Sequence, residues 1–211
     1  MTEDERLEFL IEVFRAEFKE YEKLCVPADR DGKRQLLRGL MNVRMPGPMS
    51  AEVLAVQDAY LCERAEEKGI IGLQDIPVIR NGLSVWQGDI TRLAVDAIVN
   101  AANSAMLGCF VPGHNCIDNC IQTYAGVQMR AECDRQMKLL KREYGQSYVQ
   151  PTAIPLLTDG YNLPAKKVVH IVGPVVTGPL TQKHRTELAA CYINTLDLCM
   201  REGLKSLAFC C

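Results

Sequence analysis

Residues 96–103, Asp-Ala-Ile-Val-Asn-Ala-Ala-Asn, are the stretch from which the fold can be inferred. The apolar run is short and ends in polar residues, which is typical of a strand buried on both faces of a parallel sheet. Asn100 and Asn103 follow at its carboxyl end, where open α/β sheets bind ligands. Their simpler alternative role is to hydrogen-bond the backbone of their own turn.

Strand-like and helix-like segments alternate on both sides of this stretch. Strands or extended segments are predicted at residues 76–79, 83–86, 153–156, 168–172 and 206–211, and helices at residues 117–137 and 186–201. This alternation predicts an α/β sandwich with a largely parallel central sheet.

The first 72 residues have a different, helical pattern. Leu7, Leu10, Ile11 and Phe14 recur at helical spacing, and turn-rich breaks at residues 26–32 and 45–48 separate further helices. This segment carries no cluster of reactive side chains. We therefore predict a helical extension, residues 1–72, docked on a larger domain, residues 73–211.

A metal-binding pattern lies directly after the asparagines. Cys109, His114 and Cys116 fall within residues 108–116, and the chain has only three histidines. Two thiols and an imidazole are ligands that zinc prefers, and three protein ligands leave one of four tetrahedral positions open. The alternative is that the cysteines are ordinary small apolar residues of the interior.

Each of the other polar residues could have a role in ligand binding or a purely structural role. Asp89, after Gly88 at a strand end, could accept a hydrogen bond from an amino group or a ribose, or could cap a turn. Cys116 opens a helix whose N–H groups could receive a phosphate, and Asp118 could compensate the dipole of that helix. His170, inside an apolar strand, is predicted to be a core histidine and not a metal ligand.

Composition excludes several classes of function. The chain has 211 residues, a formal net charge of -2 and an acidic amino-terminal segment. No global positive field favours nucleic acid or an anionic membrane surface, no apolar run approaches the length of a membrane span, and no signal peptide is apparent. Ten cysteines without a secretion signal are expected to be reduced thiols in the cytoplasm.

Four segments taken in order resemble the macrodomain family of ADP-ribose-binding modules: residues 88–91, 96–103, 124–126 and 170–174. Residues 108–116 stand where ordinary macrodomains carry a glycine-rich segment. With residues 38–44 and 57–61, they resemble the zinc-containing macrodomains, microbial protein-ADP-ribose hydrolases with a helical amino-terminal extension.

The resemblance implies a three-layer α/β/α macrodomain sandwich with a mixed, mostly parallel central sheet behind the helical extension. In the family the fold continues beyond the point where this sequence ends. We therefore expect the C-terminal part of the fold, including a second phosphate-binding loop, to be absent from this chain.

The resemblance also implies the roles of individual residues. Asp89 would hold the adenine amino group beside the Ile90 backbone, and Asn103 would face the distal ribose. The implied ADP-ribose contacts are Asp89, Ile90, Asn103, Cys116, Ile117 and Asp118, the implied catalytic residues are Asn103 and Asp118, and the implied Zn2+ ligands are Cys109, His114 and Cys116.

The implied activity is zinc-dependent removal of mono-ADP-ribose from modified protein side chains, with esters of acidic residues as the expected linkage. The implied partners are ADP-ribose and a mono-ADP-ribosylated protein, within a system that includes a sirtuin-type ADP-ribosyltransferase. Two alternatives stay open at this point. One is a module that binds ADP-ribose without turnover, and the other is an interaction protein whose zinc is purely structural.

Overall fold

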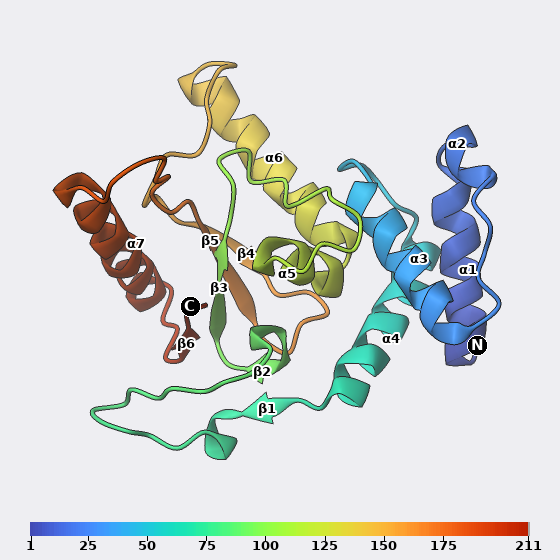
Figure 1. Cartoon of the computed structure of the whole chain (residues 1–211), viewed down its shortest axis with the longest axis horizontal. Coiled ribbons are helices and arrows are strands. Elements are labelled where there is room, and N and C mark those ends of the chain that lie inside the picture. The colour runs from blue at the N-terminus through green and yellow to red at the C-terminus, as the bar shows by residue number, and fades with distance from the viewer. Residues whose placement is uncertain (211) are drawn as a thin grey trace.

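A computed structural model describes residues 1–210. Helices α1 to α4 come first and a mixed α/β region follows (Figure 1). The elements are α1 Glu3–Ala16, α2 Lys19–Glu22, α3 Arg30–Val43, α4 Ala51–Lys68, β1 Ile71–Gly72, η1 Leu73–Asp75, η2 Ile90–Arg92, β2 Leu93–Ala94, β3 Ala97–Ala101, α5 Ile117–Ala125, α6 Val127–Tyr144, β4 Leu156–Asp159, β5 Lys167–Ile171, α7 Gln182–Arg201 and β6 Leu207–Ala208. None of these helices is long and apolar enough to cross a membrane.

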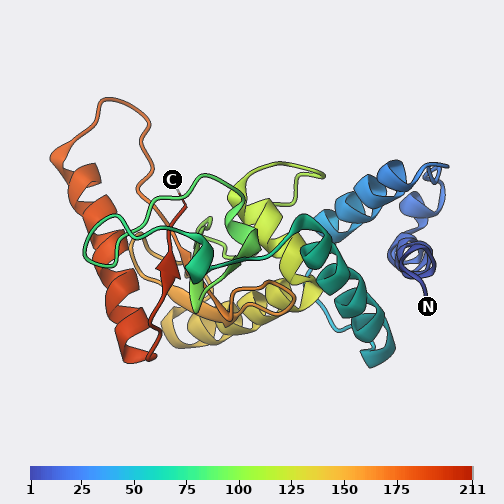
Figure 2. The same cartoon turned by 90° about the horizontal axis from the view of Figure 1, so that it is seen from below.

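The central sheet is mixed and mostly parallel, as predicted. Its strand order is β4-β5-β3-β6, with β3 parallel to both β5 and β6 and with β4 antiparallel to β5. Helices α5 and α6 cover one face and α7 covers the other (Figures 1 and 2). The predicted three-layer α/β/α sandwich is thereby confirmed.

Alternate residues of the central strands enter the two layers. Ile98 and Val168 pack in the cluster that contains α5 and α6, whereas Val99 and Val169 pack in the cluster that contains α7. All four side chains are buried. Each of these two strands, β3 and β5, therefore has consecutive apolar residues in its sequence, because both of its faces are covered.

The extension has a core of its own. Leu7, Leu10, Ile11 and Phe14 of α1 pack with residues of α3 and α4, and Val127 at the start of α6 joins this cluster. The predicted division after residue 72 stays a prediction, and Ile71–Gly72 pairs with Leu93–Ala94 on the other side of it.

Three local predictions were wrong. Residues 76–79 and 83–86 form no strand pair apart from a single bridge between Arg80 and Leu83. Ile76 and Trp86 pack on the core beside α5 and α6, but the apolar side chains between them are exposed, Val85 at 78%. The helix predicted at residues 117–137 is divided by Gly126, whose φ is +97°. The last strand covers only Leu207–Ala208, and Cys211 lies outside the described residues.

Asp96 ties the last strand to the sheet. Its carboxylate accepts a 2.7 Å hydrogen bond from Lys166 Nζ and bonds of 2.8 and 3.0 Å from the backbone N–H groups of Lys205 and Ser206. These bonds, the one from Lys166 above all, lower the pKa of Asp96 to about 2. Because the folded-state pKa lies below the unfolded value, the stabilisation is complete above that unfolded value and is lost as the pH falls toward 2.

We expect Asp96→Asn to lower the free energy of unfolding at pH 7 by about 1 kcal/mol, since its partner Lys166 is exposed and solvent screens the ion pair. The difference from the wild type should shrink as the pH is lowered below about 4. Urea unfolding across this range measures it, with Asp159→Asn as control, because Asp159 pairs only with the exposed Lys167. A difference that does not change with pH would contradict this account.

Candidate functional site

The three predicted metal ligands converge in the loop between β3 and α5. Cys109 Sγ lies 3.5 Å from His114 Nδ1, and the ligand atoms of Cys109, His114 and Cys116 all lie within 4.8 Å of one another. In a tetrahedral zinc site the Zn–S and Zn–N bond lengths place sulfur and nitrogen ligands about 3.6 Å apart. The donor types and their spacing therefore fit a zinc ion with three protein ligands.

Cys116 also begins helix α5. Its Sγ accepts a 3.4 Å hydrogen bond from the backbone N–H of Asn119, which is an N-cap contact. Burial raises the pKa of the Cys116 thiol, and the neighbouring Cys109 adds to this effect. A thiol with a raised pKa ionises readily only beside a positive charge, which a metal ion at this point would supply.

Helix α3 of the extension supports the loop that carries the three predicted metal ligands, residues 108–116, which is the predicted metal-binding loop. Arg38 Nη2 donates 2.8 and 3.1 Å hydrogen bonds to the carbonyl oxygen of His114 and to Asn119 Oδ1. Asn42 Oδ1 accepts a 2.9 Å bond from the Gly113 N–H. The extension is thus more than a cover for the domain, because the shape of the ligand loop depends on it.

Asn119 completes the support of this loop from α5. Its side-chain amide donates to the carbonyl oxygens of Cys109 and Val111, at 3.3 and 2.9 Å. Asn119 is fully buried, although it stands one position after the predicted site residue Asp118. The orientation of Cys109 is therefore set by a side chain outside the loop.

The predicted catalytic residues Asn103 and Asp118 are in contact beside the loop. Asn103 Nδ2 donates to Asp118 Oδ2 at 3.3 Å and to the Gly108 carbonyl at 3.0 Å. Asn100 Nδ2 donates to the other carboxylate oxygen at 2.8 Å. Asn103 Oδ1 also accepts from the Ala105 N–H, so the plain turn-forming role is present as well. Burial raises the pKa of Asp118, and the asparagine hydrogen bonds and Arg130 oppose that shift.

His170 is a core histidine, as predicted. It is fully buried, its Nδ1 lies 3.0 Å from Asn100 Nδ2, and its Nε2 lies 3.0 Å from Thr158 Oγ1. Burial lowers the pKa of His170 to about 4. The neutral ring therefore supports Asn100, and through it Asp118, from inside the sheet.

Arg130 is a buried cation below the site. Its Nη1 donates to the carbonyl oxygens of Met41, Asn42 and Arg44, at the C-terminal end of α3, where the helix dipole favours a cation. Its guanidinium also lies 4.3 Å from the centre of the Phe110 ring in the metal-binding loop. Burial lowers the pKa of Arg130 to about 10, so it stays charged at neutral pH and joins the extension to the loop.

Asp89 lies at the other end of the site, beside α4. Its Oδ1 accepts bonds of 3.0 and 2.6 Å from the N–H and hydroxyl of Thr91, so the predicted turn cap is present. Its Oδ2 lies 3.7 Å from Lys68 Nζ, and the side chain is 40% exposed. Ile90 follows in η2, and Ile117 begins α5 with its side chain partly exposed.

Sequence reasoning missed the residues that support the site from a distance. They are Arg38, Asn42, Lys68, Asn119 and Arg130. One signal was available in α3, where polar Arg38 and Asn42 flank the apolar positions Leu40 and Met41. Asn42 is 1% exposed, and a buried amide needs partners that its own helix does not supply.

The fold and the arrangement at the carboxyl end of β3 define the class of protein. The family model described as Macro domain matches residues 99–211, and the chain belongs to the macrodomain family.

Two relatives are similar over almost the whole chain, extension included. One is the protein-ADP-ribose hydrolase of Treponema medium, 48% identical over all of this chain and 80% of that protein. The other is the protein-ADP-ribose hydrolase of Staphylococcus aureus strain MRSA252, 42% identical over 98% of this chain and 76% of that protein. Among solved structures, the Trypanosoma brucei macrodomain in complex with ADP-ribose is similar with a TM-score of 0.55 and 26% identity, covering 82% of this chain and 72% of that chain.

Proposed function

We propose that the protein is a zinc-dependent hydrolase that removes mono-ADP-ribose from modified protein side chains, with esters of acidic residues as its substrates. The observation that carries this proposal is the convergence of Cys109, His114 and Cys116 beside the Asn103–Asp118 contact. The relatives named protein-ADP-ribose hydrolase, similar over the whole chain, support the reaction class.

Each part of the site has a role in this reaction. Cys109, His114 and Cys116 would hold zinc, which when bound can polarise an oxygen and lower the pKa of a water. The N–H groups in the first turn of α5 favour a phosphate. Asn103 is exposed and its amide is held in place by Gly108 and Asp118, so it is oriented to contact the distal ribose. Asp118 is 5% exposed and positions Asn103.

A purely structural zinc is the second candidate, because α3 and α5 both hold the ligand loop. The deciding experiment follows release of ADP-ribose from a protein esterified at an acidic side chain, with and without a chelator. We expect release that stops on chelation while circular dichroism still reports a folded chain. Full activity of a folded, metal-free protein would instead assign the zinc to structure. Binding of ADP-ribose without any release would identify a reader.

The adenine end of the site can be tested separately. We expect Asp89→Asn to weaken ADP-ribose binding at least about ten-fold, because a hydrogen bond to a charged acceptor contributes about 1.5–3 kcal/mol. Asparagine keeps an oxygen for the Thr91 cap but removes the negative charge. Isothermal titration calorimetry measures the affinity.

Asp75→Asn is the matched control, since Asp75 makes a similar turn cap with the Gly72 N–H in η1. Its ADP-ribose affinity should equal that of the wild type. Equal affinity of the wild type and Asp89→Asn would remove Asp89 from the adenine site.

A further inference from the structure

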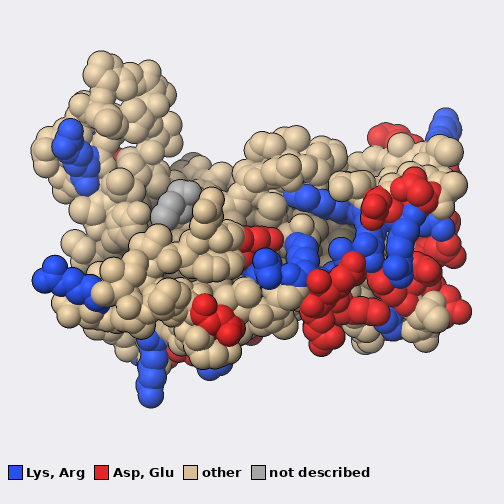
Figure 3. Space-filling model, turned by 60° about the horizontal axis from the view of Figure 1, so that its bottom comes forward, with Lys and Arg blue, Asp and Glu red and all other residues tan. Residues whose placement is uncertain are grey.

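A cleft of about 300 Å³ lies between the extension and the macrodomain, walled by α3, α4 and the second half of α5. We call it the α3–α4–α5 cleft. Four cations line it: Arg34, Arg38, Arg64 and Lys68. Figure 3 shows Lys and Arg side chains gathered between the extension and the rest of the molecule, with Asp and Glu side chains bordering them. Arg38 also supports the loop of the predicted metal ligands and Lys68 contacts Asp89, but no ligand has been assigned above to this space.

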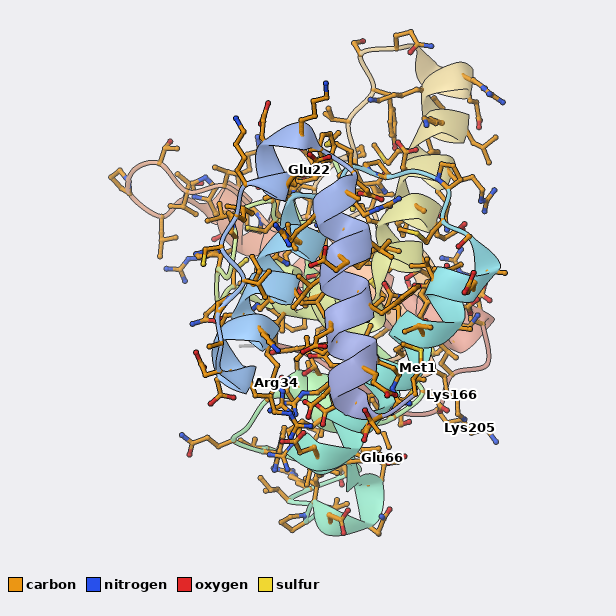
Figure 4. The ribbon with its side chains drawn as sticks, turned by 90° about the vertical axis from the view of Figure 1, so that its right-hand side faces the viewer. Met1, Glu22, Arg34, Glu66, Lys166 and Lys205 are labelled. Carbon is orange, nitrogen blue, oxygen red and sulfur yellow. The ribbon has the colours of Figure 1, made fainter. Side chains whose placement is uncertain are left out.

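The cations at the outer end of the cleft are already paired. Arg34 Nη2 lies 2.5 Å from Glu3 Oε1 and 3.1 Å from Glu67 Oε2, and Arg64 pairs with Glu67. Figure 4 shows Arg34 on α3 close to the N-terminal part of α1 and to α4. These pairs hold the helices together and leave little charge for a ligand.

The inner end differs, because Arg38 has only neutral partners. Its Nη2 contacts the His114 carbonyl, Asn119 Oδ1 and Cys120 Sγ. Its Nη1 makes no hydrogen bond to any residue in 1–210, and its buried Nε has no acceptor there. A guanidinium with a free donor edge favours a carboxylate or a phosphate. Since Arg38 also touches the metal-binding loop, an anion bound here would lie beside the site of hydrolysis.

We propose that the α3–α4–α5 cleft binds an acidic segment of the ADP-ribosylated protein, with a carboxylate of that segment on Arg38; this rests on the proposed function. Leu37, Met41 and Leu61 give the cleft apolar walls, which suit the side chains of a polypeptide. A nucleic acid is charged at every phosphate and binds along a row of free cations, whereas Arg34, Arg64 and Lys68 already pair with carboxylates of this chain. A protein segment is therefore favoured over a nucleic acid.

Charge changes at the rim test this without touching the ligand loop or the Glu3 and Glu67 pairs. Gln35 lines the cleft, is exposed and makes no hydrogen bond through its side chain within residues 1–210, and Asp31 is 90% exposed. The probe is a fluorescent, unmodified peptide of Asp, Glu and Leu residues, measured by anisotropy. Gln35→Glu should weaken binding roughly two- to five-fold, and Gln35→Lys and Asp31→Asn should strengthen it by similar factors.

Gln146→Glu and Gln146→Lys serve as controls, since Gln146 is exposed and is not among the residues that line the cleft, and the C-terminal end of α6, which it follows, points away from α3 and α4 (Figure 1). Both should bind the peptide as the wild type does, and all rim variants should keep wild-type affinity for free ADP-ribose. The proposal would be overturned if Gln35→Glu and Gln35→Lys bound the peptide with the same affinity. It would also be overturned if the two Gln146 variants changed the peptide affinity as much as the two Gln35 variants do. The same conclusion would follow if the affinity for free ADP-ribose changed with the charge at the rim. It would also follow if single-stranded RNA bound more tightly than the peptide and its affinity changed with the rim charge in the same way.

Turnover links the cleft to the reaction. A peptide esterified with ADP-ribose and flanked by acidic residues should show a KM that changes with rim charge at constant kcat. The same peptide with neutral flanks should not. If the wild type releases ADP-ribose from neither peptide, the proposed function fails, while the anisotropy result still decides whether the cleft binds acidic segments.

Discussion

Replacing Cys116 with serine is expected to remove the zinc and to lower the rate of ADP-ribose release about 1,000-fold, while the protein stays folded. Serine keeps an oxygen that can cap α5 through the Asn119 N–H, which Cys116 Sγ now does. It is a poor zinc ligand, because thiolate is the group that zinc favours. A bound metal contributes several kcal/mol to the transition state, and each 1.36 kcal/mol is a factor of ten in rate.

Metal analysis, circular dichroism and a release assay on the same preparation measure this effect. Cys120→Ser is the matched control, because Cys120 lies one turn further along α5 and is not among the three converging ligands. It should keep its zinc and most of its activity. Wild-type activity in a folded Cys116→Ser protein that lacks zinc would show that the metal does not act in the reaction.

Replacing Arg130 with methionine is expected to lower the free energy of unfolding by about 3–5 kcal/mol. The change leaves the carbonyl oxygens of Met41, Asn42 and Arg44 without their shared donor. It also removes the cation that opposes the raised pKa of buried Asp118. Methionine fills a similar volume, so the loss reports on these polar contacts and not on a cavity.

Guanidinium chloride unfolding measures this loss. Arg135→Met on the same helix is the control, since Arg135 is 61% exposed and its ion pair within residues 1–210 is with Glu132, and we expect little change in the free energy of unfolding. Similar losses of unfolding free energy in the two variants would contradict this account, because they would mean that either substitution simply weakens helix α6. Because Arg130 also packs on Phe110, the Arg130 variant should bind zinc more weakly even where it is still folded.

The features that sequence predicted correctly are those set by neighbouring residues. The run at residues 96–103 identifies β3, because burial on both faces demands continuous apolar side chains and polar residues must resume where the strand leaves the sheet. The three predicted metal ligands lie within eight residues of each other, so one loop is sufficient to bring their side chains together, and zinc binding itself stays a prediction.

The features that only the tertiary structure decided depend on contacts between distant residues. Arg38 meets the His114 carbonyl across 76 positions, and Asn42 meets Gly113 across 71, so no local pattern could assign them to the metal site. Residues 76–79 and 83–86 have strand-like composition, but a β-strand forms only beside a second strand with which it can pair. Within residues 1–210 this segment forms a single bridge, between Arg80 and Leu83. The break at Gly126 is stabilised from outside its own helix, because Gln57 of the extension accepts the Val127 N–H. The α3–α4–α5 cleft exists for the same reason, since its walls come from helices that the sequence separates and the packing of the two cores brings together.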